Sequence, residues 1–252
     1  MNAVPLSPWD LALSSGLLLV VGAASLALQL GLGRRLVVAA LRTVAQLSLV
    51  GLVLEWVFGN AHLGWVLAVF ASMVINAGVA AAQRSEQRFS GVWSTALVSV
   101  SISATLTTFI VTDVVIGIDP WYAPRYVIPL LGMVLGNTLT GISLCLERAV
   151  SDLRQRQSEV EGLLSVGATM WEASRAVISG AIRAGMIPIL NSMSVVGIVS
   201  LPGMMTGQIL SGVDPLIAVR YQIMVMCMVF GSAGISTALF LTLIKNEKIS
   251  TN

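Results

Sequence analysis

Seven long apolar segments constrain the fold of this chain more than any other feature. A window of about 20 apolar residues is long enough to cross the hydrocarbon core of a membrane as a helix. Only 10% of the residues are charged and 56% are hydrophobic, which is too few charges to cover a water-soluble surface. The sequence therefore predicts an all-α polytopic membrane protein with about seven transmembrane helices in one domain, residues 1–252. The predicted spans are residues 9–31, 36–58, 63–82, 92–117, 126–146, 186–210 and 216–244.

Positive charges lie mostly on alternate connections between these segments. The connections after the first, third, fifth and seventh segments hold most of the 14 Lys and Arg residues, whereas the opposite connections hold Arg125 and Arg220. Cytoplasmic loops carry the excess of Lys and Arg, so we expect the N-terminus outside and the C-terminus in the cytoplasm. A net charge of +2 without a basic tract does not favour nucleic-acid binding.

Residues 147–185 form the longest connection, and we expect two or three short cytoplasmic helices there. Ser158 and Glu161 have the spacing of a capping box, in which each side chain bonds the backbone N–H of the other residue. Gly167 accepts the left-handed conformation that ends many helices, so it predicts the C-terminus of this first helix. Thr169 and Glu172 have the spacing of a second capping box.

The second helix is predicted to run to about Gly185, before Pro188 opens the sixth span. Two interpretations of this pair of helices, which a glycine separates, stay open. It could be an elbow that inserts into a groove on a soluble partner, or an amphipathic surface helix with its apolar face in the headgroup region. Both rest on the apolar residues near the glycine, which are Leu163, Leu164, Met170 and Trp171.

Several motifs, most specifically a block in the sixth segment, resemble one known family. Residues 161–168 keep the glutamate and glycine of the loop that bacterial ABC-transporter permeases present to their ATPase, without its two alanines. The complete set looks like the FetB (YbbM) family over roughly residues 36–245. The resemblance rests on residues 42–47, 127–137, 161–168, 187–188, 196–207 and 214–225.

The resemblance implies the inner-membrane permease subunit of a bacterial iron exporter, with plant relatives that act in aluminium tolerance. Two such chains would pair as a homodimer with two separate ATP-binding cassette subunits. This sequence has no G-x-x-x-x-G-K-[ST] loop, so ATP and Mg would be bound by the partner, and the chain itself would not be an enzyme. The resemblance implies an ATPase-coupling segment that contains Glu161, Gly167, Ala168, Thr169, Trp171 and Glu172.

The chain departs from the family pattern at two positions in the sixth segment. The family has an Asp shortly after the proline and a Lys three residues later, and this chain has Asn191 and Ser194. A charged pair inside the membrane would be a functional site by default. Its neutral replacement keeps hydrogen bonding but no charge.

Pro202 and Gly203 interrupt the sixth segment, and Gly197, Gly203 and Gly207 are expected to give space for close helix approach. A broken helix frees backbone carbonyls, which the bilayer tolerates only against protein or a water-filled cavity. The interruption therefore favours a substrate pathway or hinge over a merely kinked packing helix.

The sequence leaves more than one role possible for the polar side chains inside the spans. Arg42 and Gln46 are four residues apart and share one helix face; Arg42 could extend to the cytoplasmic interface or bind an anionic group inside. Asn76 and Asn137 are predicted to be buried amides that tie helices together more often than they touch substrate.

Sulfur-containing residues crowd the last two segments. Thioether and thiolate ligands prefer Cu(I) and other soft ions, which makes Met204, Met205 and Cys227 weak candidate metal ligands. Methionine also fills irregular apolar space, and this interpretation is favoured.

The leading hypothesis is an ABC permease subunit that exports iron by ATP hydrolysis in a separate subunit. The alternatives are export of another metal or of a small anionic metabolite held by Arg42, and a receptor or scaffold without transport. A secondary carrier is disfavoured because no acidic residue lies in the middle of a span.

Overall fold

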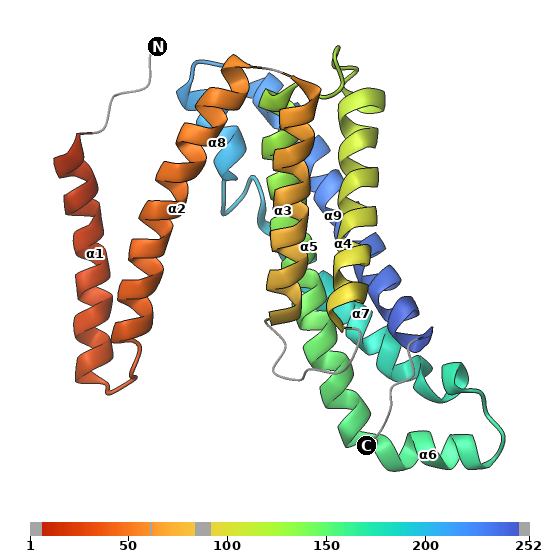
Figure 1. The fold of residues 1–252 in the computed structure, drawn as a ribbon. Coiled ribbons are helices and arrows are strands. Elements are labelled where there is room, and N and C mark those ends of the chain that lie inside the picture. The colour runs from red at the N-terminus through yellow and green to blue at the C-terminus, as the bar shows by residue number, and fades with distance from the viewer. Residues whose placement is uncertain (1–6, 61, 84–91, 247–252) are drawn as a thin grey trace. The chain divides into compact units, whose positions relative to one another are not determined.

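A computed structural model describes residues 7–60, 62–83 and 92–246 (Figure 1). Helices dominate this part of the chain, and seven of them are long and apolar enough to cross a membrane. The prediction of an all-α protein with seven candidate membrane-spanning helices is confirmed. The α-helices are α1 (Pro8–Ala27), α2 (Gly33–Gly59), α3 (Leu63–Gln83), α4 (Val92–Phe109), α5 (Pro124–Gln155), α6 (Gln157–Ser165), α7 (Met170–Val195), α8 (Gly203–Leu210) and α9 (Pro215–Asn246), and a π-helix, Ile110–Val115, continues α4.

The chain divides into two compact units, and the first contains α1 and α2 together with residues 210–212. α1 starts at a capping box in which Ser7 and Asp10 each bond the backbone N–H of the other residue. α1 and α2 contact each other along a hairpin. Its turn is held by the Ser25 hydroxyl, which accepts a hydrogen bond from the Leu32 N–H at 3.2 Å.

The second unit contains α3, α4, α5, α6, α7, α9 and most of α8. α5 contacts α3, α4, α7 and α9, so it forms the centre of the bundle. Its side chains Leu131 and Ile142 are fully buried together with Phe240 of α9. Figure 1 shows α6 across the ends of α5 and α7, at the opposite end of the bundle from the turn between the π-helix and α5.

Hydroxyl side chains of α4 and of the π-helix that continues it are buried in the second unit. Ser99, Thr107 and Thr112 are buried and each donates to the backbone carbonyl four residues earlier. Such bonding satisfies hydroxyls inside an apolar bundle. Between helices, the hydroxyls of Thr138 and Ser232 lie 3.0 Å apart and share a hydrogen bond.

α5 and α7 approach each other closely where Gly141 and Gly185 face each other. A Cβ at Gly185 would lie 2.7 Å from the carbonyl oxygen of Gly141, 3.0 Å from Cγ2 of Thr237 and 3.1 Å from Cβ of Cys145. Since real Cβ atoms are essentially never found under 3.0 Å from another heavy atom, only glycine fits here. Small residues permit such approach between membrane helices.

Two predicted boundaries in this unit are wrong. The fifth span was expected to end at residue 146, but α5 continues to Gln155. The second cytoplasmic helix and the sixth span were expected to be separate, but α7 runs unbroken from Met170 to Val195 with Pro188 inside it. Proline removes one helical hydrogen bond and is tolerated in a membrane helix where neighbouring groups satisfy the freed carbonyl.

Candidate functional site

The connection between α5 and α7 forms an elbow, which we define as residues 152–173. The predicted two or three short helices of residues 147–185 are in fact one short helix, α6, between the ends of two long ones. The prediction was wrong because hydropathy falls at the membrane surface although the helices continue beyond it. α6 contacts both α7 and α5.

The first predicted capping box does not form. α6 begins at Gln157, with Arg156 as its N-cap residue and no side-chain cap, so Ser158 lies inside the helix. The chain turns at Arg156 directly after α5, which starts the new helix two residues too early for Ser158 to cap it. Glu161 instead accepts a hydrogen bond from Nε2 of Gln157, at 2.8 Å and one helical turn away.

Gly167 ends α6 as predicted. Its φ angle is +92°, in the left-handed region that favours glycine. The Gly167 N–H donates to the Leu164 carbonyl and the Ala168 N–H donates to the Leu163 carbonyl, both at 3.1 Å. This pair of bonds is the Schellman motif, which fixes the direction in which the chain leaves a helix.

The second predicted capping box is confirmed and starts α7. The Thr169 hydroxyl accepts from the Glu172 N–H at 3.3 Å, and the Glu172 carboxylate accepts from the Thr169 N–H at 2.8 Å. Gly167 and Thr169 are only two residues apart. Both ends of the turn between α6 and α7 are therefore fixed by hydrogen bonds.

The elbow has an apolar inner side and an apolar outer side. Val160 and Ala173 are buried on the inner side. On the outer side, Val166 at the tip is 80% exposed. Exposed apolar residues beside a fixed turn are typical of a surface that docks a protein groove or an apolar membrane layer. The other exposed members are Leu163, Leu164, Met170 and Trp171.

An ion pair that we did not predict lies on α5, where the elbow begins. Nε of Arg148 donates to Oδ2 of Asp152 at 2.9 Å, one turn apart on α5. The Asp152 side chain is 9% exposed and the Arg148 side chain is 56% exposed. The spacing of four residues between opposite charges was the sequence signal that could have indicated this pair.

The unequal burial of this pair predicts unequal effects of mutation. Arg148→Ala leaves a buried carboxylate without its counter-charge and should destabilise the chain by about 1–3 kcal/mol. Asp152→Asn leaves an exposed arginine and a polar amide, and should cost less. Thermal unfolding of the purified protein shows which of the two substitutions lowers the unfolding midpoint more. Arg154→Ala, on the same helix, is the control. Equal midpoints for Arg148→Ala and Arg154→Ala would contradict this assignment.

The predicted sixth span was expected to break at Pro202 and Gly203. The observed break is longer and begins six residues before Pro202, at Val196. α7 ends at Val195, residues 196–202 form a loop, and α8 starts only at Gly203, directly after Pro202. The Gly197 N–H donates to the Ser200 carbonyl at 2.9 Å, and this loop contains the isolated bridge between Val196 and Ser200.

The glycines at this break meet no neighbour within the described part of the chain. A Cβ at Gly197, Gly203 or Gly207 would meet no atom within 4 Å, so their expected role in close helix approach stays a prediction. Gly197 has a φ angle of +80° and is needed for the turn itself. Glycines that do permit close approach lie outside the motif, and they include Gly141, Gly185 and Gly78, the last against Leu97 of α4.

Asn191 and Ser194 lie on the last turns of α7, beside this break, and both are exposed. The Ser194 hydroxyl donates to the Leu190 carbonyl of its own helix at 2.8 Å. The structure therefore places both departures from the family pattern immediately before the unwound residues 196–202.

The predicted burial of two amides is wrong. Asn76 and Asn137 are exposed, and each amide donates to a backbone carbonyl four residues earlier, on Ser72 and Met133 respectively. Both amides therefore bond within their own helix and join no second helix in the described part of the chain.

The sulfur residues of the second unit lie mostly against its core. Met204, Met224 and Met226 pack on the core cluster and Met228 belongs to it, whereas Cys227 is exposed. Met205 is partly buried. Within the described ranges, no group of three His, Cys, Asp or Glu side chains could hold a metal ion.

In the first unit, Arg42 and Gln46 are exposed on α2. An open depression of about 530 Å³ is lined by Arg42, Arg34 and Arg35, with Val38 and Ala39 between them. The three guanidinium groups thus share one side of the helix, so an anion bound there would meet several positive charges.

Comparison with known proteins assigns the chain to a family. The model of the uncharacterised protein family UPF0014 matches residues 8–249. This chain belongs to UPF0014. A UPF0014 membrane protein of Synechocystis sp. is 40% identical over 86% of this chain and 85% of its own length. No solved structure matches.

Two further relatives carry functional names. The probable iron export permease protein FetB of Escherichia coli is 32% identical over 94% of this chain and 90% of its own length. The protein ALUMINUM SENSITIVE 3 of Arabidopsis thaliana is 35% identical over 78% of this chain and 70% of its own length. This UPF0014 chain is thus a multi-pass membrane protein from a permease family.

The UPF0014 structure brings only some of the predicted site residues together. All six residues of the predicted coupling segment lie in the elbow: Glu161, Gly167, Ala168, Thr169, Trp171 and Glu172. Asn191, Ser194, Pro202 and Gly203 border the unwound residues 196–202. Arg42 and Gln46 lie in the other unit.

Proposed function

We propose that this chain is the permease subunit of an ABC transporter in the inner membrane, and that it exports iron as a homodimer with a separate ATPase. The family membership and the name of the relative FetB support the permease role and the substrate. ATP and Mg would bind to the partner subunit, which would supply the chemical energy.

The elbow is the observation that supports the ATPase partner most strongly. Its outer side exposes Leu163, Val166 and Met170, and its turn is fixed by the Schellman motif at Gly167 and by the capping box at Thr169. A fixed apolar projection enters a groove with little loss of conformational entropy. A surface that only rests on lipid has no need of such a fixed turn.

The continuous α7 provides a route from the elbow to the break. Closure of the ATPase dimer on ATP would push α6, and the movement would pass to the start of α7. Because α7 is unbroken from Met170 to Val195, the movement would reach its far end as a rigid displacement. The residues that can change conformation lie directly beyond, at 196–202. At these residues the substrate pathway would switch between opening to the cytoplasm and opening to the outside.

The test is elemental analysis of cells loaded with iron, manganese, zinc or copper, with and without this chain and its ATPase. We expect lower iron in expressing cells and no difference when the ATPase is inactivated. Lower copper alone would contradict iron export and favour Met204, Met205 and Cys227 as ligands. An unchanged cellular content of all four metals would contradict the hypothesis that this chain exports any of them.

The arginine cluster on α2 favours a second candidate, export of a small anionic metabolite. Arg34, Arg35 and Arg42 line one depression, and guanidinium groups bind carboxylates and phosphates in bidentate fashion. In this case Arg42→Gln would abolish ATPase stimulation by the anion without changing cellular iron. If Arg42→Gln changes neither, the anion candidate fails and the arginines act at the membrane interface.

A further inference from the structure

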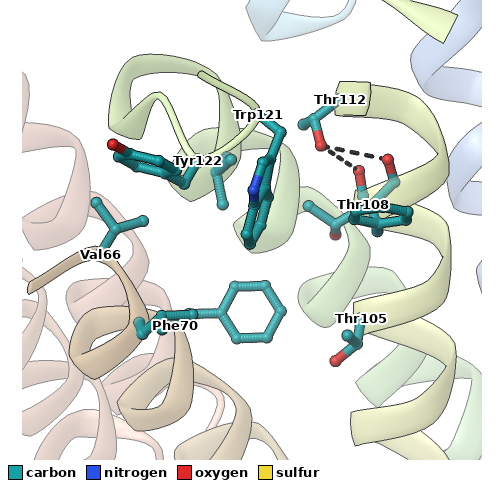
Figure 2. Close-up of a pocket in the computed structure, with 10 residues that line it drawn as sticks. Val66, Phe70, Thr105, Thr108, Thr112, Trp121 and Tyr122 are labelled. Carbon is teal, nitrogen blue, oxygen red and sulfur yellow. Dashed lines mark hydrogen bonds between the residues drawn. The ribbon is translucent and has the colours of Figure 1, made fainter. Parts of the chain in front are cut away.

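Two hollows of this chain differ in their chemistry. A small cavity of about 130 Å³ in the second unit is lined by ten residues, none of them charged. Figure 2 shows Phe70 and Trp121 across this cavity from Thr108. Its wall offers no counter-charge to an ion. The depression on α2 is different, because three of its five lining residues are arginines.

All the residues that line the depression belong to the first three turns of α2. Arg34, Val38 and Arg42 are spaced four residues apart, so they form one row along the helix, with Arg35 and Ala39 beside it. Helical side chains lean toward the N-terminus of their helix. The Arg42 side chain is therefore directed back toward the other two arginines, and the three guanidinium groups share one open surface.

These arginines have no counter-charge in the described part of the chain. All three are exposed, and the ion pairs between described residues lie in the second unit. The acidic residues of the first unit are Asp10, in the first turn of α1, and Glu55, near the end of α2. Both lie at the other end of the hairpin from the arginines (Figure 1). Like charges repel one another at short range, so the depression attracts an anion.

The depression lies beside the turn where two candidate membrane spans meet. α1 and α2 are both long and apolar enough to cross a membrane, so the turn between them lies at a membrane surface. α2 has 27 residues and is about 40 Å long, which matches a bilayer with its headgroup layers. Arg34 and Arg35 at its start therefore lie at headgroup depth. Arg42 lies about 12 Å further along the helix axis, and its long side chain extends back toward the surface.

Apolar side chains surround the arginines. Val37 and Leu41 of α2 are exposed, and so are Leu28 and Leu30 in the turn before it. A small soluble anion has no apolar part to cover these side chains. A phospholipid has both parts, because its phosphate suits guanidinium groups and its acyl chains suit the apolar surface. The surface is therefore complementary to an amphipathic ligand.

The shape of the depression also favours a ligand that the membrane itself supplies. A pocket for a small soluble molecule usually encloses more than about 70% of the surface of its ligand. Here the wall is one segment of a single helix, which cannot enclose a ligand in this way. A phospholipid needs no enclosure, because the bilayer holds it beside the protein. It also brings its phosphate to an arginine that would otherwise lie unpaired at the edge of the hydrocarbon.

We propose that the depression formed by Arg34, Arg35 and Arg42 binds the phosphate headgroup of an anionic phospholipid. The guanidinium groups donate hydrogen bonds to the phosphate oxygens, and the acyl chains lie against Val37 and Leu41. An anionic lipid binds in preference to a zwitterionic one, because the three positive charges repel the ammonium group of a zwitterionic headgroup. Binding requires neither ATP, the ATPase nor iron, so it is independent of the proposed export function.

The test compares two lipids with the same acyl chains, dioleoyl phosphatidylglycerol and dioleoyl phosphatidylcholine. Native mass spectrometry of the full purified chain in detergent measures the dissociation constant of each lipid. We expect phosphatidylglycerol to bind more tightly. One arginine near a membrane surface raises the affinity for anionic lipid about fivefold. Arg42→Gln should therefore weaken phosphatidylglycerol about fivefold, replacement of all three arginines by Gln should weaken it by more than about twentyfold, and phosphatidylcholine binding should stay unchanged.

A matched control removes the same charge elsewhere. Arg154→Gln, Arg175→Gln and Arg183→Gln, combined in one chain, replace three exposed arginines of α5 and α7 that form no ion pair with another described residue. This variant should keep the wild-type affinity for phosphatidylglycerol. The thermal unfolding midpoint confirms that each variant is folded, and Arg42→Gln alone preserves the comparison if the triple variant on α2 is not folded.

Three results would overturn the site. An equal loss of phosphatidylglycerol affinity in the control variant would show that net charge alone attracts the lipid. Equal affinities of the wild-type chain for the two lipids would remove the role of the arginines. Glycerol phosphate keeps the phosphate and lacks acyl chains, so it should not displace phosphatidylglycerol even in large excess. Displacement would make the depression a site for a soluble anion, whether or not the chain exports iron.

Discussion

Gly167→Val is expected to reduce ATP-driven efflux more than tenfold while the membrane-spanning helices stay folded. The φ angle of +92° at Gly167 is open to glycine and strained for a β-branched residue. No atom lies within 4 Å of a Cβ at this position, so the strain comes from the backbone and not from crowding. A strain of about 1–3 kcal/mol would unwind the Schellman motif and misdirect the tip of the elbow.

A graded series makes this prediction specific. Asparagine tolerates the left-handed conformation better than valine, so Gly167→Asn should retain more efflux than Gly167→Val. Gly162→Ala is the matched control, because Gly162 lies in α6 with open space around it. The measurements are iron efflux and the amount of ATPase that co-purifies with the tagged permease. Wild-type ATPase retention in Gly167→Val would contradict the docking role of the elbow.

Gly185→Ala is expected to destabilise the bundle by about 1–3 kcal/mol, and Gly185→Leu to prevent its folding. An added Cβ would lie 2.7 Å from the Gly141 carbonyl oxygen, which belongs to the backbone and cannot rotate away. α5 and α7 would have to separate, and the contacts of both helices with α9 at Thr237 would open. The loss should therefore exceed that of an ordinary surface substitution.

The unfolding midpoint of the purified chain measures this effect. Gly136→Ala is the control, because Gly136 also lies in a membrane helix and its Cβ would meet no atom within 4 Å. Since alanine favours the helix over glycine, the control midpoint should stay unchanged or rise slightly. Equal midpoints for Gly185→Ala and Gly136→Ala would show that α5 and α7 do not approach closely at Gly185.

Local chemistry made several parts of the site predictable. The capping box at Thr169 and the left-handed turn at Gly167 depend on residues within five positions, so spacing alone indicated them. The capping box predicted at Ser158 had the same spacing and was wrong. The preceding helix ends at Gln155, and this decides where α6 can begin. The residues of the Ser158 motif do not indicate where α5 ends.

Contacts between distant segments were not predictable in the same way. The pairing of Gly141 with Gly185 joins two helices, and neither glycine belongs to a motif. The exposure of Asn76 and Asn137 depends on which helix faces are already packed.

The amino-acid sequence was enough to predict that this chain crosses a membrane with seven apolar helices, because span length and hydropathy are properties of continuous segments. It also determined the chemistry of the turn between α6 and α7. In contrast, the continuity of α7 through Pro188 and the position of the unwound residues at 196–202 are seen only in the folded chain. A proline or a glycine does not specify its own effect in a membrane helix, because the neighbouring helices decide which freed backbone groups are satisfied.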